Sequence, residues 1–143
     1  MDHSHALQMA SRTDAGMVRS HNEDAVFSNA VLGLAILADG MGGYNAGEVA
    51  SGMATTLLGS ELEKAFQKTA PHQLDASGKL YSHSVLEAEI ARANTAIYQA
   101  AQSQPQYAGM GTTLVATLCY DKMMTVAHIR DSRLDRLRGD EFQ

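Results

Sequence analysis

The chain has 143 residues, of which 45% are hydrophobic and 19% charged, and its formal net charge is −5 at pH 7. This length allows one domain with a workable core, and the negative charge argues against nucleic acid as a partner. The first ten residues do not predict a secretory signal, and no apolar stretch reaches membrane-spanning length. Its single cysteine, Cys119, excludes an internal disulfide. We therefore expect a cytoplasmic protein without a membrane partner.

The first part of the chain predicts short strands followed by a helix. Residues 8–13 and 24–28 are strand candidates, and the apolar run Val31–Ala38 is typical of a strand covered on both faces. From Ala46 to about Phe66, apolar residues recur at helical spacing. Three strands and one long helix are therefore expected here.

A polar loop and a second helix are expected next. Residues 68–79 are mainly polar and include a proline and a glycine, as loops do. Ser84 and Glu87 have the spacing of a capping box, in which two side chains satisfy backbone N–H groups of the first turn. This pattern predicts a helix from Ser84 to about Gln102.

The rest of the chain predicts antiparallel β-structure. Residues 113–120 and 123–129 are rich in β-branched and apolar side chains, and the two residues between them suit a tight turn. Residues 133–138 are a candidate third strand of this meander. The order of elements predicts an α+β fold, with helices packed on an antiparallel sheet and no βαβ units.

Carboxylates stand at the ends of several predicted strands. Glu23 and Asp24 precede one strand, Asp39 ends the apolar run, and Asp131 follows a later strand. Oxygen ligands without a cysteine or histidine pair suit a hard cation such as Mg²⁺ or Mn²⁺. We therefore expect these acids to form a divalent-cation site.

Glycines and an arginine accompany the acids. Gly40 follows Asp39 directly and, having no Cβ, could bring its carbonyl close to an ion, whereas Gly42 and Gly43 allow a tight turn. Arg19 precedes the first acids, and its planar guanidinium suits phosphate. The alternative is that the Asp-Gly pair is only a turn, but the neighbouring acids favour the cation site.

A nucleotide-binding loop is a second alternative. The sequence Gly40-Met41-Gly42 begins like a G-x-G-x-x-G fingerprint, but Asn45 stands where the third glycine belongs. An acid directly before such a loop would also repel a pyrophosphate. A dinucleotide site is therefore not expected.

Four motifs resemble, in order and approximate spacing, the first half of bacterial metal-dependent protein phosphatases, the PPM or protein phosphatase 2C family. They are "TDAGMVRSHNED", "LADGMGGYNAGEVAS", "GMGTTLVATL" and "AHIRDSRL". The resemblance implies an antiparallel β-sandwich flanked by helices, with metal ions at one end. Residues 1–8 would be a tail, and residues 9–143 the N-terminal part of the phosphatase domain.

The resemblance also implies roles for the metal-site residues. Asp39 would bridge two Mn²⁺ or Mg²⁺ ions, and the Gly40 carbonyl would ligate one of them. Glu23 would act through metal-bound water, Asp24 would support the site, and Asp131 would help to hold a third ion.

The implied reaction is hydrolysis of phosphoserine or phosphothreonine by metal-activated water. Arg19 would hold the substrate phosphate, so Arg19 and Asp39 are the catalytic candidates. The substrate would be a protein phosphorylated by a serine/threonine kinase.

The chain departs from the family pattern in three ways. Arg130 stands where glycine is usual and would compete with a metal for Asp131, and Asp135 replaces an aromatic residue. Family members also continue beyond Gln143 with two further aspartates. We therefore expect a fragment or truncated product with slow turnover or none, and with sheet edges that favour self-association.

Two functional hypotheses stay open at this point. One is a serine/threonine phosphatase, or the front half of one. The other is a catalytically weak or inactive remnant that binds a phosphopeptide or a partner protein through Arg19.

Overall fold

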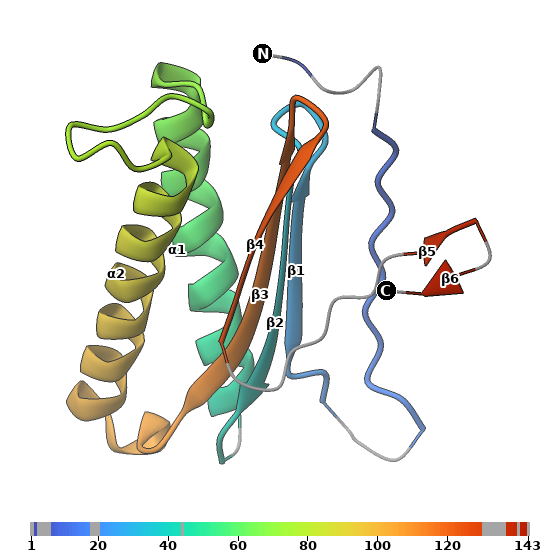
Figure 1. The fold of residues 1–143 in the computed structure, drawn as a ribbon. Coiled ribbons are helices and arrows are strands. Elements are labelled where there is room, and N and C mark those ends of the chain that lie inside the picture. The colour runs from blue at the N-terminus through green and yellow to red at the C-terminus, as the bar shows by residue number, and fades with distance from the viewer. Residues whose placement is uncertain are drawn as a thin grey trace.

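A computed structural model describes residues 2, 7–17, 21–43, 45–129, 137–139 and 141–142. Its main element is a four-stranded antiparallel sheet in the order β1-β2-β3-β4, with two long helices on one face (Figure 1). The elements are β1 (Asp24–Asn29), β2 (Leu34–Met41), α1 (Ala46–Lys68), α2 (Tyr81–Ser103), the 3₁₀ helix η1 (Pro105–Tyr107), β3 (Gly111–Tyr120), β4 (Met123–Ile129), β5 (Leu137–Arg138) and β6 (Glu141–Phe142).

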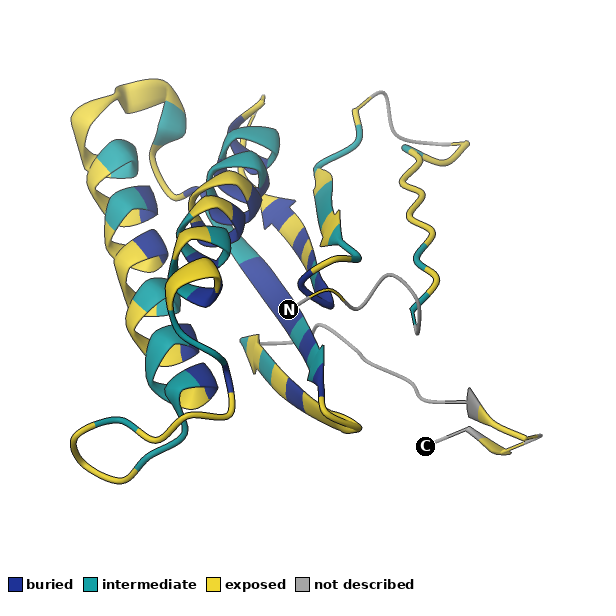
Figure 2. Ribbon diagram, turned by 90° about the horizontal axis from the view of Figure 1, so that it is seen from above, coloured by how far each residue is buried: buried dark blue, intermediate teal, exposed yellow. Residues whose placement is uncertain are grey.

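Alternation along β2 separates a covered face of the sheet from an open face. Leu34, Ile36 and Ala38 are almost fully buried, whereas Leu37 and Asp39, which alternate with them, are exposed. Figure 2 shows strands along which the buried and exposed colours alternate. Side chains alternate across a strand, so the neighbouring strands continue the same two faces. The antiparallel sheet covered by helices on one face confirms the predicted fold class.

Helix α1 forms the centre of the core because its apolar residues recur on one side. The buried apolar side chains of this helix are Ala46, Ala50, Ala54, Leu58, Leu62 and Phe66. Gly59, on the same helix, lets the sheet approach closely, since a Cβ there would be 3.0 Å from the ring of Phe27. Neither this helix nor α2 has a stretch long and apolar enough to cross a membrane, among the residues described.

The capping box predicted for the second helix is wrong. Helix α2 begins at Tyr81, and the Ser84 hydroxyl donates to the Asp75 carboxylate in the preceding loop. Glu87 pairs instead with Lys79, with 2.6 Å between Oε2 and Nζ. Ser84 and Glu87 therefore bind residues of the preceding loop and do not cap the helix.

Asp75 organises the loop between the two helices. Its Oδ1 accepts hydrogen bonds from the side chain of Ser77 at 2.6 Å and from the backbone N–H of Lys79 at 3.0 Å. The hydrogen bonds from Ser77, then Ser84, then the Lys79 backbone hold the pKa of the Asp75 carboxyl well below its usual range. The charged carboxylate therefore stabilises this loop.

The tight turn between β3 and β4 is confirmed. Asp121 and Lys122 have φ of 45° and 64°, which is the positive pair that a type I′ hairpin turn requires. Beside the turn, the Tyr120 hydroxyl lies 3.0 Å from the Ser82 hydroxyl and 3.1 Å from the Thr125 hydroxyl. This buried chain of hydroxyl groups joins α2 to the hairpin.

Several predicted strand boundaries are wrong. Strand β2 starts at Leu34, because residues 30–33 form a turn, and it continues to Met41, so that Asp39 lies within the strand. Residues 8–13 are extended but not part of a ladder. Strand β5 pairs with β6 rather than extending the meander, and residues 131–136 lie outside the described part of the chain.

The open face of the sheet is only partly covered by the described residues. Figure 1 shows the extended N-terminal segment and the β5–β6 hairpin on the side of the sheet away from the helices. A hollow of about 700 Å³ lies between residues 8–12 and the open face, with Val26, Leu37 and Val115 among its lining. The predicted β-sandwich has a second sheet facing this one. Among the described residues, only the N-terminal segment and the β5–β6 hairpin lie on that side.

Candidate metal centre

Two carboxylates lie directly opposite each other on the open face. The register of β1 and β2 pairs Asp24 with Asp39, and both residues are exposed. Directly opposed residues of an antiparallel pair have Cβ atoms about 5 Å apart, where like charges destabilise the sheet. A cation bound between these two side chains would offset that repulsion.

Glu23 joins this end of the sheet through its backbone. The Gly40 N–H donates to the Glu23 carbonyl at 2.9 Å, which places the residue after Asp39 beside the residue before Asp24. The backbones of Glu23, Asp24, Asp39 and Gly40, the four described residues expected at the site, thus lie at the same end of the sheet.

Gly40 also has a packing role that the sequence did not suggest. A Cβ built on Gly40 would lie 1.9 Å from the carbonyl oxygen of Gly47. Only glycine therefore lets the first turn of α1 cross the end of β2 at this distance. Gly47 belongs to the glycine-rich second motif, but the sequence alone assigns it no role, because a glycine near the start of a helix is easily taken for part of the preceding turn.

Two threonines that sequence reasoning missed hold the main chain of Asp39. The Thr112 hydroxyl lies 3.1 Å from the Asp39 carbonyl oxygen and 2.8 Å from that of Thr113, and it can donate to either one. The Thr113 hydroxyl lies 3.4 Å from the Asp39 carbonyl oxygen. Both threonines follow Gly111 in the third motif, at the start of a predicted strand. Two adjacent hydroxyl groups at this point were the feature of the sequence that could have indicated a role near the acids. These contacts fix the backbone that presents the Asp39 side chain.

Arg19 and Asp131 lie outside the described residues, as do Arg130 and Asp135. Within the part of the chain that is described, no three His, Cys, Asp or Glu side chains are grouped closely enough to hold a metal ion. Chemically, the carboxylates and the Gly40 carbonyl fit a hard cation, since all their donors are oxygens. The described residues therefore provide part of a ligand set.

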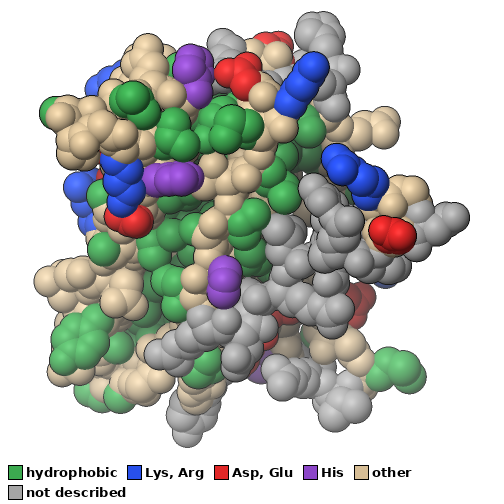
Figure 3. All heavy atoms as spheres, in the orientation of Figure 1, with side chains coloured by type: hydrophobic (Ala, Val, Ile, Leu, Met, Phe, Trp, Pro, Cys, Tyr) green, Lys and Arg blue, Asp and Glu red, His purple; other side chains and the backbone are tan. Residues whose placement is uncertain are grey.

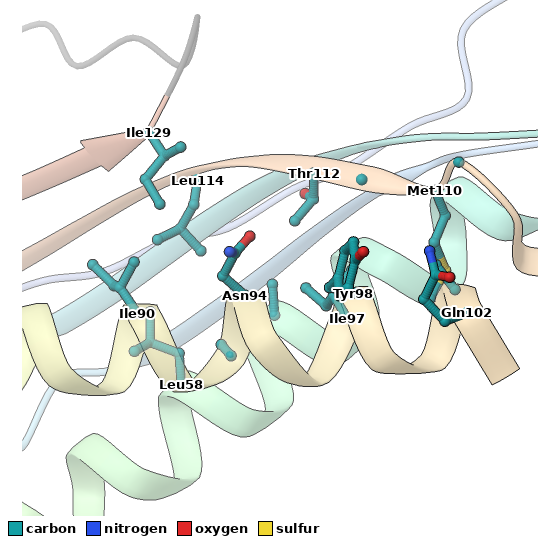
Figure 4. A pocket seen from close by; sticks show the side chains of 15 residues that line it. Leu58, Ile90, Asn94, Ile97, Tyr98, Gln102, Met110, Thr112, Leu114 and Ile129 are labelled. Atoms are coloured by element: carbon teal, nitrogen blue, oxygen red, sulfur yellow. The ribbon is translucent and has the colours of Figure 1, made fainter.

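A separate crevice of about 320 Å³ lies between α2 and β3 (Figure 4). Ile90 and Asn94 extend into it from the helix, facing Leu114 and Ile129 on the sheet. None of the described residues that line it is charged. Because this described lining offers neither an acid nor a basic group, it does not suit a metal ion or a phosphate.

Comparisons with known proteins identify the family. Residues 13–143 match the protein phosphatase 2C family. The chain is 38% identical over 136 residues to the serine/threonine protein phosphatase PstP of Mycobacterium tuberculosis, which covers 95% of this chain and 24% of that relative. It is 37% identical over 139 residues to the protein phosphatase PhpP of Streptococcus pneumoniae, covering 95% and 52% respectively. This chain belongs to the protein phosphatase 2C family.

Solved structures agree with this assignment. The crystal structure of M. tuberculosis PstP/Ppp matches with a TM-score of 0.76 at 36% identity, over 94% of this chain and 51% of that chain. The PstP catalytic domain in complex with two manganese ions matches with a TM-score of 0.74 at 38% identity, over 93% and 52%. The chain thus spans about half of these solved chains, and a smaller share of full-length PstP.

Proposed function

We propose that this chain provides the N-terminal part of a metal-dependent protein phosphatase that hydrolyses phosphoserine and phosphothreonine. The opposed pair Asp24 and Asp39, joined to Glu23 through the Gly40 backbone, carries this proposal. Family membership supports it, since the relatives are named serine/threonine phosphatases. The same names do not favour the alternative of a non-catalytic binding module.

Mn²⁺ or Mg²⁺ would be held at the acidic end of the open face, as two ions with a third near Asp131. The relative with two bound manganese ions supports this choice of metal. When bound, such ions would lower the pKa of a coordinated water and offset charge on the phosphoryl oxygens. Asp39 and the Gly40 carbonyl would bind them directly, whereas Glu23 and Asp24 would orient water and support the ligands.

Arg19 would bind the substrate phosphate. A guanidinium offers two parallel N–H donors to a phosphate, and this geometry orients the phosphorus toward the attacking water. The substrate would be a protein phosphorylated by a serine/threonine kinase, and the location would be the cytoplasm. The roles of Arg19 and Asp131 are inferred from the motifs alone.

Self-association through the sheet edges is a further part of the proposal. Strands β1 and β4 are the edges of the four-stranded sheet, and Met123, Met124 and Val126 on β4 are exposed. Figure 3 shows hydrophobic side chains running down the middle of the molecule in the same view as Figure 1. An edge with exposed apolar side chains can pair with another chain.

The test is Mn²⁺-dependent hydrolysis of a phosphothreonine peptide by the purified chain and by its Asp39→Asn variant. We expect slow turnover that requires Mn²⁺ and that falls at least 100-fold in the variant, because a neutral amide binds a hard cation less well than a carboxylate does. Asp121→Asn is the matched control, since Asp121 lies in the turn at the other end of the sheet. Turnover that survives Asp39→Asn would contradict the proposed site.

A further inference from the structure

Gly47, in the first turn of α1, lies directly against the carboxylate of Glu23. A Cβ built on Gly47 would be 2.8 Å from the Glu23 Cδ and 3.0 and 3.1 Å from its two carboxylate oxygens. Separations below 3.0 Å are essentially not found for real Cβ atoms, so any side chain here would displace its neighbour. Gly47 is not among the residues with positive φ, so backbone conformation does not explain the glycine.

Gly47 differs from Gly40 and Gly59 in the neighbouring group that a new Cβ atom would displace. At Gly40 the nearest atom is a backbone oxygen, and at Gly59 it belongs to the ring of Phe27. At Gly47 it is the far end of a flexible glutamate. A methyl group at Gly47 would therefore cost the fold little, because the Glu23 carboxylate can swing away, but it would change where that carboxylate lies.

The position against α1 also suits the charge of Glu23. The N-terminus of a helix carries partial positive charge from its aligned peptide dipoles, which stabilises a nearby carboxylate. Because Gly47 has no side chain, the Glu23 carboxylate can contact the first turn of α1. The glycine and the helix terminus together define one location for this acid at the end of the sheet.

We propose that Gly47 is a positioning residue, which leaves the space that the Glu23 carboxylate needs in order to serve the metal ions. The inference rests on the proposed function, because it assigns a partner to one of the acids of that site. Groups that fix the orientation of a metal-site residue typically change metal affinity by about 10–100-fold when they are altered. Replacement of Gly47 should therefore act on metal binding rather than on folding.

The experiment measures Mn²⁺ affinity of the full chain by electron paramagnetic resonance of free Mn²⁺, with thermal unfolding of the same samples. Gly47→Ala should weaken Mn²⁺ binding about 10-fold, with a melting temperature close to that of the unaltered chain. Gly52→Ala is the matched control, because this glycine lies in the same helix and a Cβ there meets nothing within 4 Å. The control should bind Mn²⁺ as the unaltered chain does.

A shorter acid provides the compensating variant. Glu23→Asp removes one methylene and draws the carboxylate back from Gly47. In the Glu23→Asp background, the additional change Gly47→Ala should alter Mn²⁺ affinity less than about twofold, since the two groups no longer collide. A purely structural role of Gly47 would give the same loss in both backgrounds.

The outcomes separate this inference from the proposed function. If Glu23→Gln weakens Mn²⁺ binding but Gly47→Ala does not, the metal site stands and the positioning role is wrong. If Gly47→Ala unfolds the chain while Gly52→Ala does not, backbone packing explains the glycine and the positioning role is again wrong. If the unaltered chain does not bind Mn²⁺, both the site and the inference fail.

Discussion

The two faces of the four-stranded sheet share their strands but differ in what their side chains contact. Toward the helices, Leu34 and Ile36 are at most 2% exposed, whereas Leu37 on the open face is 40% exposed. The open face also carries the like-charged residues Asp24 and Asp39 directly opposite each other. Hydrophobic burial thus explains the covered face, whereas the open face carries groups that packing alone does not explain.

The same comparison separates what the chain shares with any α+β domain from what marks its family. A sheet with helices on one face could support many activities. The paired acids, the threonines that hold Asp39 and the glycine contacts at the start of α1 lie together at one end of this sheet. The functional proposal therefore depends on that end and not on the fold.

The largest expected effect comes from shortening a leucine on the covered face. Leu34→Ala should lower the free energy of unfolding by about 2–5 kcal/mol, because it removes fully buried methyl groups and leaves a cavity. Leu37→Ala, three residues along the same strand, should cost less than about 1 kcal/mol. Urea unfolding measures both, and equal losses that grow with protein concentration would show that a second copy covers the open face.

Gly40→Ala should have the next largest effect. The new Cβ would meet the Gly47 backbone oxygen at 1.9 Å, so α1 would have to move, at a cost of about 3 kcal/mol. Gly43→Ala is the control, because a Cβ at Gly43 meets nothing within 4 Å. Equal stability of the two variants would mean that α1 does not cross β2 in the way described.

The buried hydroxyl chain on the covered side offers a smaller effect. Tyr120→Phe removes the hydroxyl between Ser82 and Thr125, and leaving buried polar groups without this partner should cost about 1–2 kcal/mol. Tyr98→Phe, at a side chain that is 64% exposed, should change the stability very little. Chemical denaturation of both variants tests the difference, and a neutral Tyr120→Phe would show that water replaces the hydroxyl.

The smallest effect concerns charge, and it contrasts Asp75 with Asp39. Because hydrogen bonds lower the folded-state pKa of Asp75 below its unfolded value of about 3.9, its stabilisation is present above that value and is lost as pH falls toward the folded-state pKa. The melting temperature of Asp75→Asn should therefore lie below that of the unaltered chain at pH 7, and the gap should narrow progressively as the pH falls below about 4. Asp39→Asn without metal should show no such loss.

Two results would contradict the predictions for Asp75 and Asp39. An Asp75→Asn variant that melts at the same temperature as the unaltered chain at pH 7 would show that the loop does not depend on the charge. A marked loss of stability for metal-free Asp39→Asn would show that Asp39 stabilises the sheet directly.

Short sequence patterns correctly predicted the elements that depend on interactions between residues close in the sequence. The helical spacing in α1 and the two-residue turn after Tyr120 predicted their structures correctly. The capping box failed because Asp75, distant in the pattern, takes the Ser84 hydroxyl. Residues 8–13 have the composition of a strand, but pairing depends on a partner strand, which composition cannot supply.

The candidate site was predictable where its residue types are unusual. Acids at strand ends and a glycine after Asp39 pointed to Glu23, Asp24 and Gly40. Gly47 could not be predicted, because its contact with Glu23 depends on how α1 crosses the sheet. Thr112 was missed for the same reason, since its bond to Asp39 joins positions distant in the sequence.

The most direct test of the central claim is to locate bound Mn²⁺ on the chain. Amide spectra recorded by NMR during a Mn²⁺ titration report proximity, because the paramagnetic ion broadens nearby signals. We predict that amides of residues 23–24 and 39–40 broaden first, that Asp39→Asn abolishes this selective broadening, and that Asp121→Asn preserves it. Broadening that is spread over other acids, or that is unchanged in Asp39→Asn, would contradict a metal site at this end of the open face.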